Sequence, residues 1–167
     1  MNLGPDSILC IHGGGTYGDK ENTLRRWIDQ FDDLPRNVKS RIAIENCEKN
    51  YNVRDCLEIS EATGVPVIYD AHHYKCYDLY HPNETQEEIS DMLPEIIDSW
   101  SGRKMLCHVS DQAQGKAVGA HHDYVAEIPK HLLSIPMEYN IGIDIEVEAK
   151  AKEAAIFKLY SKYNDIF

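Results

Sequence analysis

Short apolar segments alternate with longer amphipathic segments along the whole chain, and this alternation strongly limits the folds open to it. The short segments are rich in Ile, Val and Leu and have the length of buried strands. Between them, apolar residues recur at the spacing of one helix face. The pattern predicts strands over residues 7–12, 41–46, 65–70, 104–108 and 141–147, and helices over about 19–34, 53–63, 89–100, 124–133 and 149–163.

Local signals place several helix ends. Asn52 is a plausible N-cap of the second helix, and Gly64 follows its last turn. The run from Thr85 to Glu88 resembles a capping box ahead of the next helix. Residues 71–74 are expected to form a loop after the third strand. These signals leave the five strands separated by helical crossovers.

Five consecutive strand–helix units predict an α/β fold with a parallel sheet covered by helices. No linker or tandem repeat divides residues 1–167, so we expect a single domain. Two architectures fit: an open doubly wound sheet, or part of a (β/α)₈ TIM barrel. A complete barrel usually needs about 250 residues, so the 167 residues here predict about five βα units and not a whole barrel.

Composition narrows the class of protein. No apolar run is long enough to span a membrane, and the N-terminal residues do not resemble a secretory signal. The five cysteines form no CxxC pair, and Cys10 and Cys107 fall in strands predicted to be buried. Reduced thiols of this kind indicate a cytoplasmic or nuclear protein that is not secreted. The net charge of −11 argues against broad nucleic-acid binding, unless bound cations offset the carboxylates.

Four consecutive predicted strands end in residues that can bind metals. In a parallel α/β protein these ends lie on one face, where ligands bind. A lone His after a strand is more often simply hydrogen-bonded, and an acid there can cap a loop or helix. Repetition at successive strand ends favours a site for Zn²⁺, Mn²⁺ or Fe²⁺. The residues concerned are His12, Glu45, Asp70 with His72 and His73, His108, and Asp144, Glu146 and Glu148 of the fifth strand region.

Other motifs have ordinary interpretations. Gly13-Gly14-Gly15 lacks the spacing of a dinucleotide site and fits a close turn beside a substrate. Tyr74, Tyr77 and Tyr80 suit either base stacking or packing within a loop. The charged run over residues 148–153 is typical of a solvated helix face.

Several short motifs together resemble the UV damage endonuclease family, which is related to the endonuclease IV and xylose isomerase barrels. Each motif is weak alone, but they follow the family's order over nearly the whole chain. They are His12-Gly13-Gly14, Tyr17-Gly18-Asp19-Lys20-Glu21, Ile44-Glu45-Asn46, Val67 to His73, His108-Val109-Ser110, His121-His122-Asp123-Tyr124-Val125 and Asp144 to Lys150.

The resemblance implies a metal-dependent DNA repair endonuclease that cuts the backbone on the 5′ side of UV photoproducts in double-stranded DNA. It implies two or three divalent ions, foremost Mn²⁺, with Zn²⁺ or Mg²⁺ as alternatives. By motif, the metal ligands would be His12, Glu45, Asp70, His73, His108 and Glu148. Catalytic roles would fall to Glu45, His121 and Lys150, and supporting or substrate-contacting roles to His72, Asn46 and Tyr124.

The chain departs from the family pattern in three ways. It matches the C-terminal part of the barrel, so the early strands are absent. The family's metal-binding lysine, two residues before His108, is replaced by Leu106, and the acid after Glu-Asn is replaced by Cys47. These departures keep three alternatives open: a second copy or a separate N-terminal half that completes the barrel, a non-catalytic barrel remnant that binds metal or nucleic acid, and a sugar isomerase or epimerase of the xylose isomerase type.

Overall fold

A single five-stranded parallel sheet forms the centre of the computed structural model, which describes residue 4 and residues 7–164. The strand order is β1-β2-β3-β4-β5, so each strand pairs with its neighbour in sequence. This order is that of successive βα units in a barrel wall. The strands are β1 (Leu9–His12), β2 (Ile42–Glu45), β3 (Val67–Asp70), β4 (Met105–Val109) and β5 (Ile143–Val147).

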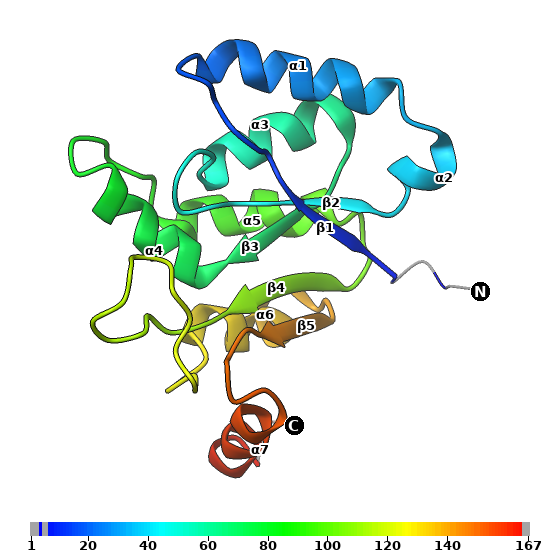
Figure 1. Ribbon diagram of the computed structural model, residues 1–167. Coiled ribbons are helices and arrows are strands. Elements are labelled where there is room, and N and C mark those ends of the chain that lie inside the picture. Colours follow the sequence, from blue (N-terminus) through cyan, green and yellow to red (C-terminus); the bar gives the residue numbers. More distant parts are fainter. Residues whose placement is uncertain (1–3, 5–6, 165–167) are drawn as a thin grey trace.

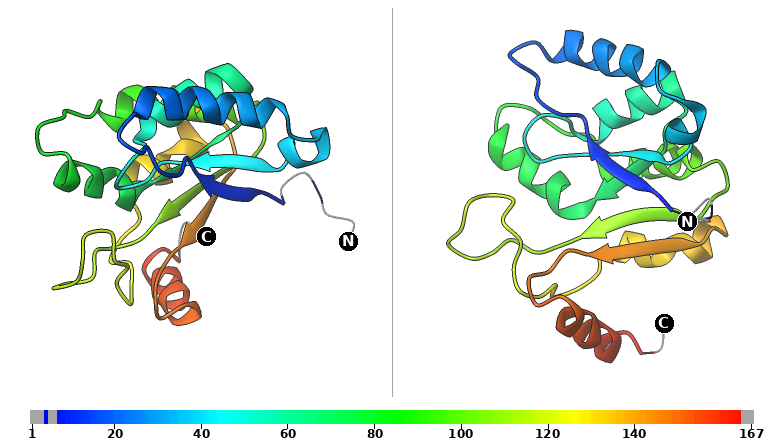
Figure 2. Two further views of the ribbon diagram at one scale, coloured as in Figure 1. Left: turned by 45° about the horizontal axis from the view of Figure 1, so that its top comes forward. Right: turned by 45° about the vertical axis from the view of Figure 1, so that its right-hand side comes forward.

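Helices pack against one side of the sheet. Figure 1 shows α1, α3 and α5 stacked along that side, and Figure 2 keeps them there in two further views. The helix α7 lies apart, beside the end of β5. Within residues 7–164 the helices are α1 (Lys20–Asp32), α2 (Arg36–Lys39), α3 (Val53–Thr63), α4 (Ala71–Tyr80), α5 (Ile89–Ser99), α6 (Lys130–Tyr139) and α7 (Glu153–Lys162).

The two faces of the sheet differ because strand side chains alternate between them. Ile44, Val67 and Tyr69 are fully or almost fully buried in the core on the helix side. Trp100 closes that core, and its indole Nε1 donates to the Val67 carbonyl at 2.9 Å. The opposite face carries the candidate ligands. Strand register aligns them across the sheet, with His12 opposite Glu45, Asp70 opposite His108, and His108 opposite Glu146.

The sheet confirms the predicted five βα units, and α3 ends as the sequence indicates. Asn52 caps α3 through a capping box with Asp55, and Gly64 ends it in the left-handed conformation. Other boundaries were wrong. Residues 71–74 form the first turn of α4 because the Asp70 carboxylate accepts the backbone amides of His72 and His73. The run from Thr85 to Glu88 provides no side-chain cap to α5.

Two further boundaries and one burial prediction also need correction. The helix expected from residue 124 begins at Lys130, because Pro129 disfavours helical conformation in the residue before it. The last helix begins at Glu153 and not at 149, after turns in which Lys152 has φ 50°. Cys10 is exposed, since β1 is an edge strand with one neighbour, whereas Cys107 is buried as predicted.

Candidate metal centre

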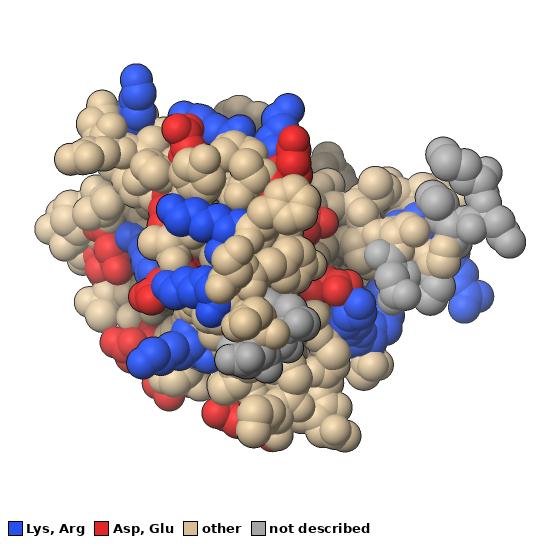
Figure 3. Space-filling view, turned by 90° about the horizontal axis from the view of Figure 1, so that it is seen from below, with Lys and Arg blue, Asp and Glu red and all other residues tan. Residues whose placement is uncertain are grey.

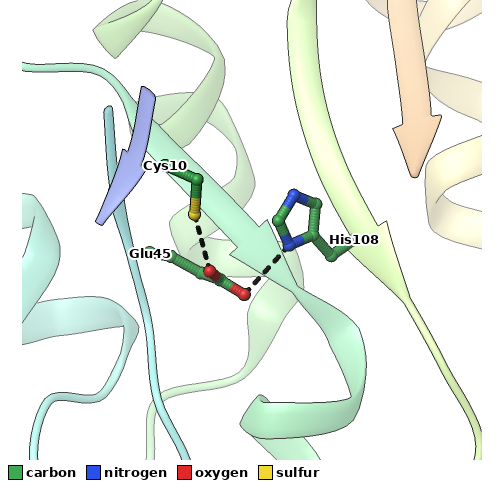
Figure 4. Close-up of side chains that lie close together, drawn as sticks. All are labelled: Cys10, Glu45 and His108. Carbon is green, nitrogen blue, oxygen red and sulfur yellow. Dashed lines mark hydrogen bonds and ion pairs between the residues drawn. The ribbon is translucent and has the colours of Figure 1, made fainter. Parts of the chain in front are cut away.

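Glu45 is the hub of the cluster at the strand ends. Its carboxylate ends β2 and is 3% exposed. One oxygen, Oε2, lies 2.9 Å from His12 Nε2 and 2.7 Å from Cys10 Sγ. The other, Oε1, lies 3.0 Å from His108 Nδ1. Side chains from β1, β2 and β4 therefore meet at one carboxylate (Figure 4).

Asp70 has two structural tasks at the end of β3. Its Oδ1 accepts the backbone amides of His72 at 2.6 Å and His73 at 2.7 Å, which starts α4 directly after the strand. Its Oδ2 has no hydrogen-bond partner, although Asp70 is fully buried. An unpaired oxygen on a buried carboxylate is costly unless a cation or donor meets it. Asp70 therefore caps α4 with one carboxylate oxygen and leaves the other without a hydrogen bond.

Asn46 ties the ends of β2 and β3 together. Its Nδ2 donates to the Asp70 carbonyl at 3.0 Å, and its Oδ1 accepts the Asp70 amide at 2.8 Å. Its own carbonyl oxygen lies 3.0 Å from His73 Nδ1. Asn46 is 1% exposed, so it supports the ligands from behind.

The two histidines at the start of α4 lie in different surroundings. His73 turns toward the cluster, with Nδ1 3.5 Å from Glu45 Oε1 and 3.6 Å from Asp70 Oδ2. His72 lies against the Cys76 sulfur at 3.6 Å and edge-on to the His121 ring. His73 is placed to bind an ion and His72 to hold its neighbours.

The remaining candidates lie around the mouth of the site. Glu148 belongs to the cluster, and its Oε2 is 3.6 Å from His121 Nε2. Lys150 is exposed beside Glu148 and His121 on the rim of a shallow pocket. Tyr124 packs under Lys158 of α7, with 4.7 Å between the ammonium and the ring centroid. Neither Lys150 nor Tyr124 is one of the residues that gather around Glu45.

The charged groups of the cluster shift one another's pKa values. Burial acts to raise the pKa of Glu45, but hydrogen bonds from His108, His12 and His73 outweigh it and hold that pKa far below its usual range. Burial raises the pKa of Asp70 to about 6. Burial acts to lower the pKa of His73, but Glu45 and Asp70 outweigh it and raise that pKa to about 9. Burial and the Glu45 carboxylate also raise the pKa of the Cys10 thiol.

The donor atoms fit divalent ions. Three overlapping groups each bring their ligand atoms within 4.8 Å of one another: Cys10, Glu45 and His108; His12, Glu45 and His73; and Glu45, Asp70, His108 and Glu148. Besides Asp70 Oδ2, the buried His108 Nε2 lacks a hydrogen bond, although Glu146 Oε2 lies 3.2 Å away. Carboxylates and imidazoles with open atoms of this kind suit Mn²⁺ or Zn²⁺.

The structure adds residues that the motifs did not indicate. Cys10 touches Glu45, and Glu48 Oε2 lies 3.9 Å from His73 Nε2. The position of Cys10 has a simple sequence signal, because it precedes His12 by two residues and must share its face of the strand. Glu48 follows a bend after β2, where no periodicity predicts direction.

The model of the UV-endonuclease UvdE family matches residues 1–166. The chain belongs to this UvdE family. A protein of Acanthamoeba polyphaga mimivirus is 38% identical over 165 residues, covering 96% of this chain and 48% of the viral protein. The UV DNA damage endonuclease of Bacillus velezensis is 32% identical over 170 residues, which cover 99% of this chain and 51% of the Bacillus protein.

The UvdE fold also matches in three dimensions. The crystal structure of SacUVDE superposes with a TM-score of 0.77 at 31% identity and covers 95% of this chain and 51% of that chain. This match confirms the expected barrel-like α/β architecture. The chain spans about half the length of the curated relatives it matches. The UvdE family is a family of UV endonucleases, which act on DNA.

Two further expectations concern a membrane span and a partner that completes the barrel. Among the described helices, none has the length and apolar character needed to cross a membrane. The comparisons lend no support to the idea that a second copy or a separate N-terminal half completes the barrel.

Proposed function

We propose that this chain is a single domain, corresponding to the C-terminal part of a UvdE barrel, that holds the metal centre of a DNA repair endonuclease. The reaction is hydrolysis of the phosphodiester backbone on the 5′ side of a UV photoproduct in double-stranded DNA. The observation that carries the proposal is the buried Asp70 Oδ2, which has no hydrogen bond, in the cluster around Glu45 of a chain that belongs to the UvdE family.

The metal ligands are His12, Glu45, Asp70, His73, His108 and Glu148, for two or three divalent ions, with Mn²⁺ foremost. Such ions supply positive charge for the scissile phosphate and lower the pKa of an attacking water. Glu45 joins the groups because each of its oxygens faces different side chains. Asn46 and His72 fix the orientation of Asp70 and His73 from behind.

Two residues at the mouth are placed for contact with substrate. His121 is half-buried near Glu148 and can pass a proton to the leaving 3′ oxygen. Lys150 is exposed on the same rim and offers positive charge to the phosphate. Glu45 has the third catalytic role by holding the ions in place.

Positive charge for DNA comes from outside the cluster as well. Figure 3 shows Lys and Arg side chains interspersed with acidic ones on the face that carries α7. On this helix Lys158 lies over Tyr124, and Lys162 donates to the Ala126 carbonyl at 2.8 Å. Because the whole chain carries a net charge of −11, bound divalent ions are needed to make the site attractive to phosphate.

The proposal is tested by nicking of supercoiled plasmid with Mn²⁺. We expect the chain to nick UV-irradiated plasmid and to leave unirradiated plasmid intact. Glu45→Gln should lower the rate by roughly 100-fold or more, while Glu58→Gln, a matched change on the exposed face of α3, should leave it unchanged. Mapping the cut on a duplex with one defined photoproduct checks the 5′ side.

The results separate the proposal from its alternatives. Circular dichroism of Glu45→Gln shows whether the fold persists. Metal binding without any nicking by the unmodified chain would overturn the endonuclease assignment and leave a metal-binding barrel remnant. Equal nicking by both Glu→Gln variants would overturn the assignment of Glu45.

A further inference from the structure

Cys10 points from the edge strand β1 into the strand-end cluster. Its Sγ lies 2.7 Å from Glu45 Oε2, while His108 Nδ1 lies 3.0 Å from Glu45 Oε1. Figure 4 shows the sulfur and the imidazole approaching the same carboxylate from different sides. The three donor atoms of this group lie within 4.8 Å of one another. A sulfur, an oxygen and a nitrogen donor therefore surround one small volume.

The other cysteines have different surroundings. Cys56 and Cys107 are fully buried in the apolar core, and Cys76 is buried against His72. Cys47 is buried and its sulfur accepts backbone amides. Of the five cysteines, all of which lie in the described part of the chain, Cys10 is the exposed one. An ion can reach it from solvent.

A second observation points to a ligand at this place. His108 is only 3% exposed, and its Nε2 has no hydrogen bond, although Glu146 Oε2 lies 3.2 Å away. The neighbouring Asp70 Oδ2 is buried and also without a hydrogen bond. Buried polar atoms are almost always hydrogen-bonded in folded proteins, so two buried atoms without hydrogen bonds in one strand-end cluster indicate a missing cation.

We propose that Cys10 is a thiolate ligand in a metal position shared with Glu45 and His108, and that this position takes Zn²⁺ or Co²⁺ in preference to Mn²⁺ and Mg²⁺. Thiolate is a soft ligand that selects zinc-like ions, whereas carboxylate and water suit Mn²⁺ and Mg²⁺. As the sulfur–metal bond forms, the thiol releases its proton to solvent. The inference rests on the proposed metal centre and assigns one position within it.

The geometry needs only a small adjustment. Zinc bonds sulfur at about 2.3 Å and nitrogen at about 2.0 Å, so two ligands of one ion lie less than about 4.3 Å apart. The present separations lie within 4.8 Å, and β1 is an edge strand free to shift on one side. The group of Glu45, Asp70, His108 and Glu148 contains no sulfur and suits Mn²⁺. The centre thus offers two kinds of position.

Cobalt binding to the full chain tests the assignment. A Co²⁺–thiolate bond gives a charge-transfer absorption in the near ultraviolet, whereas any bound Co²⁺ gives visible d–d bands. We expect both in the unmodified chain and in Cys107→Val, a control at a thiol buried on the helix side. Cys10→Ser should keep the d–d bands and lose the charge-transfer band. It should also weaken Zn²⁺ binding by roughly 10-fold or more and Mn²⁺ binding far less.

Each outcome decides the matter. Bound Co²⁺ without a charge-transfer band in the unmodified chain overturns the role of Cys10 and leaves the proposed metal centre standing. A charge-transfer band that survives in Cys10→Ser also overturns it. Absence of any Co²⁺ spectrum overturns both this inference and the metal centre on which it rests.

Discussion

Replacement of Asp70 by Asn should stabilise the metal-free protein while impairing metal binding. Asp70 is fully buried, and its pKa is raised to about 6 from an ordinary value of 3.8. Because the folded pKa lies above the unfolded one, the folded state binds more protons between these values, and stability falls as pH rises from about 4 to about 6. Above pH 6 the ionised Asp70 carboxylate lowers the free energy of unfolding by its full amount, about 3 kcal/mol for this difference in pKa.

Asn is suited to this test because its size matches that of Asp. Its Oδ1 can still accept the amides of His72 and His73, so the start of α4 is preserved. The variant loses the attraction between the Asp70 carboxylate and His73, so the gain should be smaller than the full cost. In EDTA at pH 8 we expect Asp70→Asn to raise the free energy of unfolding by about 1–3 kcal/mol, and by almost nothing at pH 4.

Urea unfolding followed by circular dichroism measures these differences. In Mn²⁺ the order should reverse, because metal bound to the folded state stabilises the unmodified protein more than the variant. Loss of stability in Asp70→Asn at pH 8 in EDTA would refute the reasoning that the buried, ionised carboxylate destabilises the metal-free protein. Equal stabilisation of both proteins by Mn²⁺ would refute its role as a ligand.

Further predictions concern His73, Asn46 and Gly13. Because metal binds neutral imidazole, Mn²⁺ affinity should rise between pH 6.5 and 9 as His73 loses its proton, and calorimetry showing pH-independent affinity would contradict the raised pKa of His73. In the metal-free protein, protonated His73 contributes stability that is complete below about pH 6.5 and lost by about pH 9. Asn46→Ala should lower the free energy of unfolding by about 2–4 kcal/mol in urea titrations, since it removes two buried hydrogen bonds to the backbone of Asp70. A loss under about 1 kcal/mol would count against this bridge. Gly13→Ala should lower the free energy of unfolding by about 1–3 kcal/mol, because a Cβ there would lie 2.6 Å from the Tyr51 ring. In the control Gly142→Ala, the nearest contact of the new Cβ is the flexible Lys104 side chain at 3.2 Å, so the thermal midpoint should change far less than in Gly13→Ala.

The sheet was predictable because its signals are local. Each strand is a short apolar run, and the longer helices between them show a clear period, so the order of the strands followed directly. The helices α2 and α4 were not predicted. The N-cap of α3 also followed from Asn52 and Gly64. The start of α4 could not be predicted this way, because Asp70 serves as a cap only once the strand before it is fixed in the sheet.

The site was partly predictable for a similar reason. Parallel strands bring their C-terminal ends together, so His12, Glu45 and His108 had to converge. Distances between side chains depend on packing across the sheet, which residue types alone do not specify. The sequence therefore suggested that Cys10 was a buried core residue, whereas its edge position exposes it beside Glu45.

Anomalous diffraction from crystals grown with Mn²⁺ tests the central claim of a metal centre at the strand ends most directly. The account predicts a peak at the manganese edge bounded by Glu45, Asp70, His108 and Glu148. Peaks found only at exposed acids away from these four residues, or no peak at all, would contradict it.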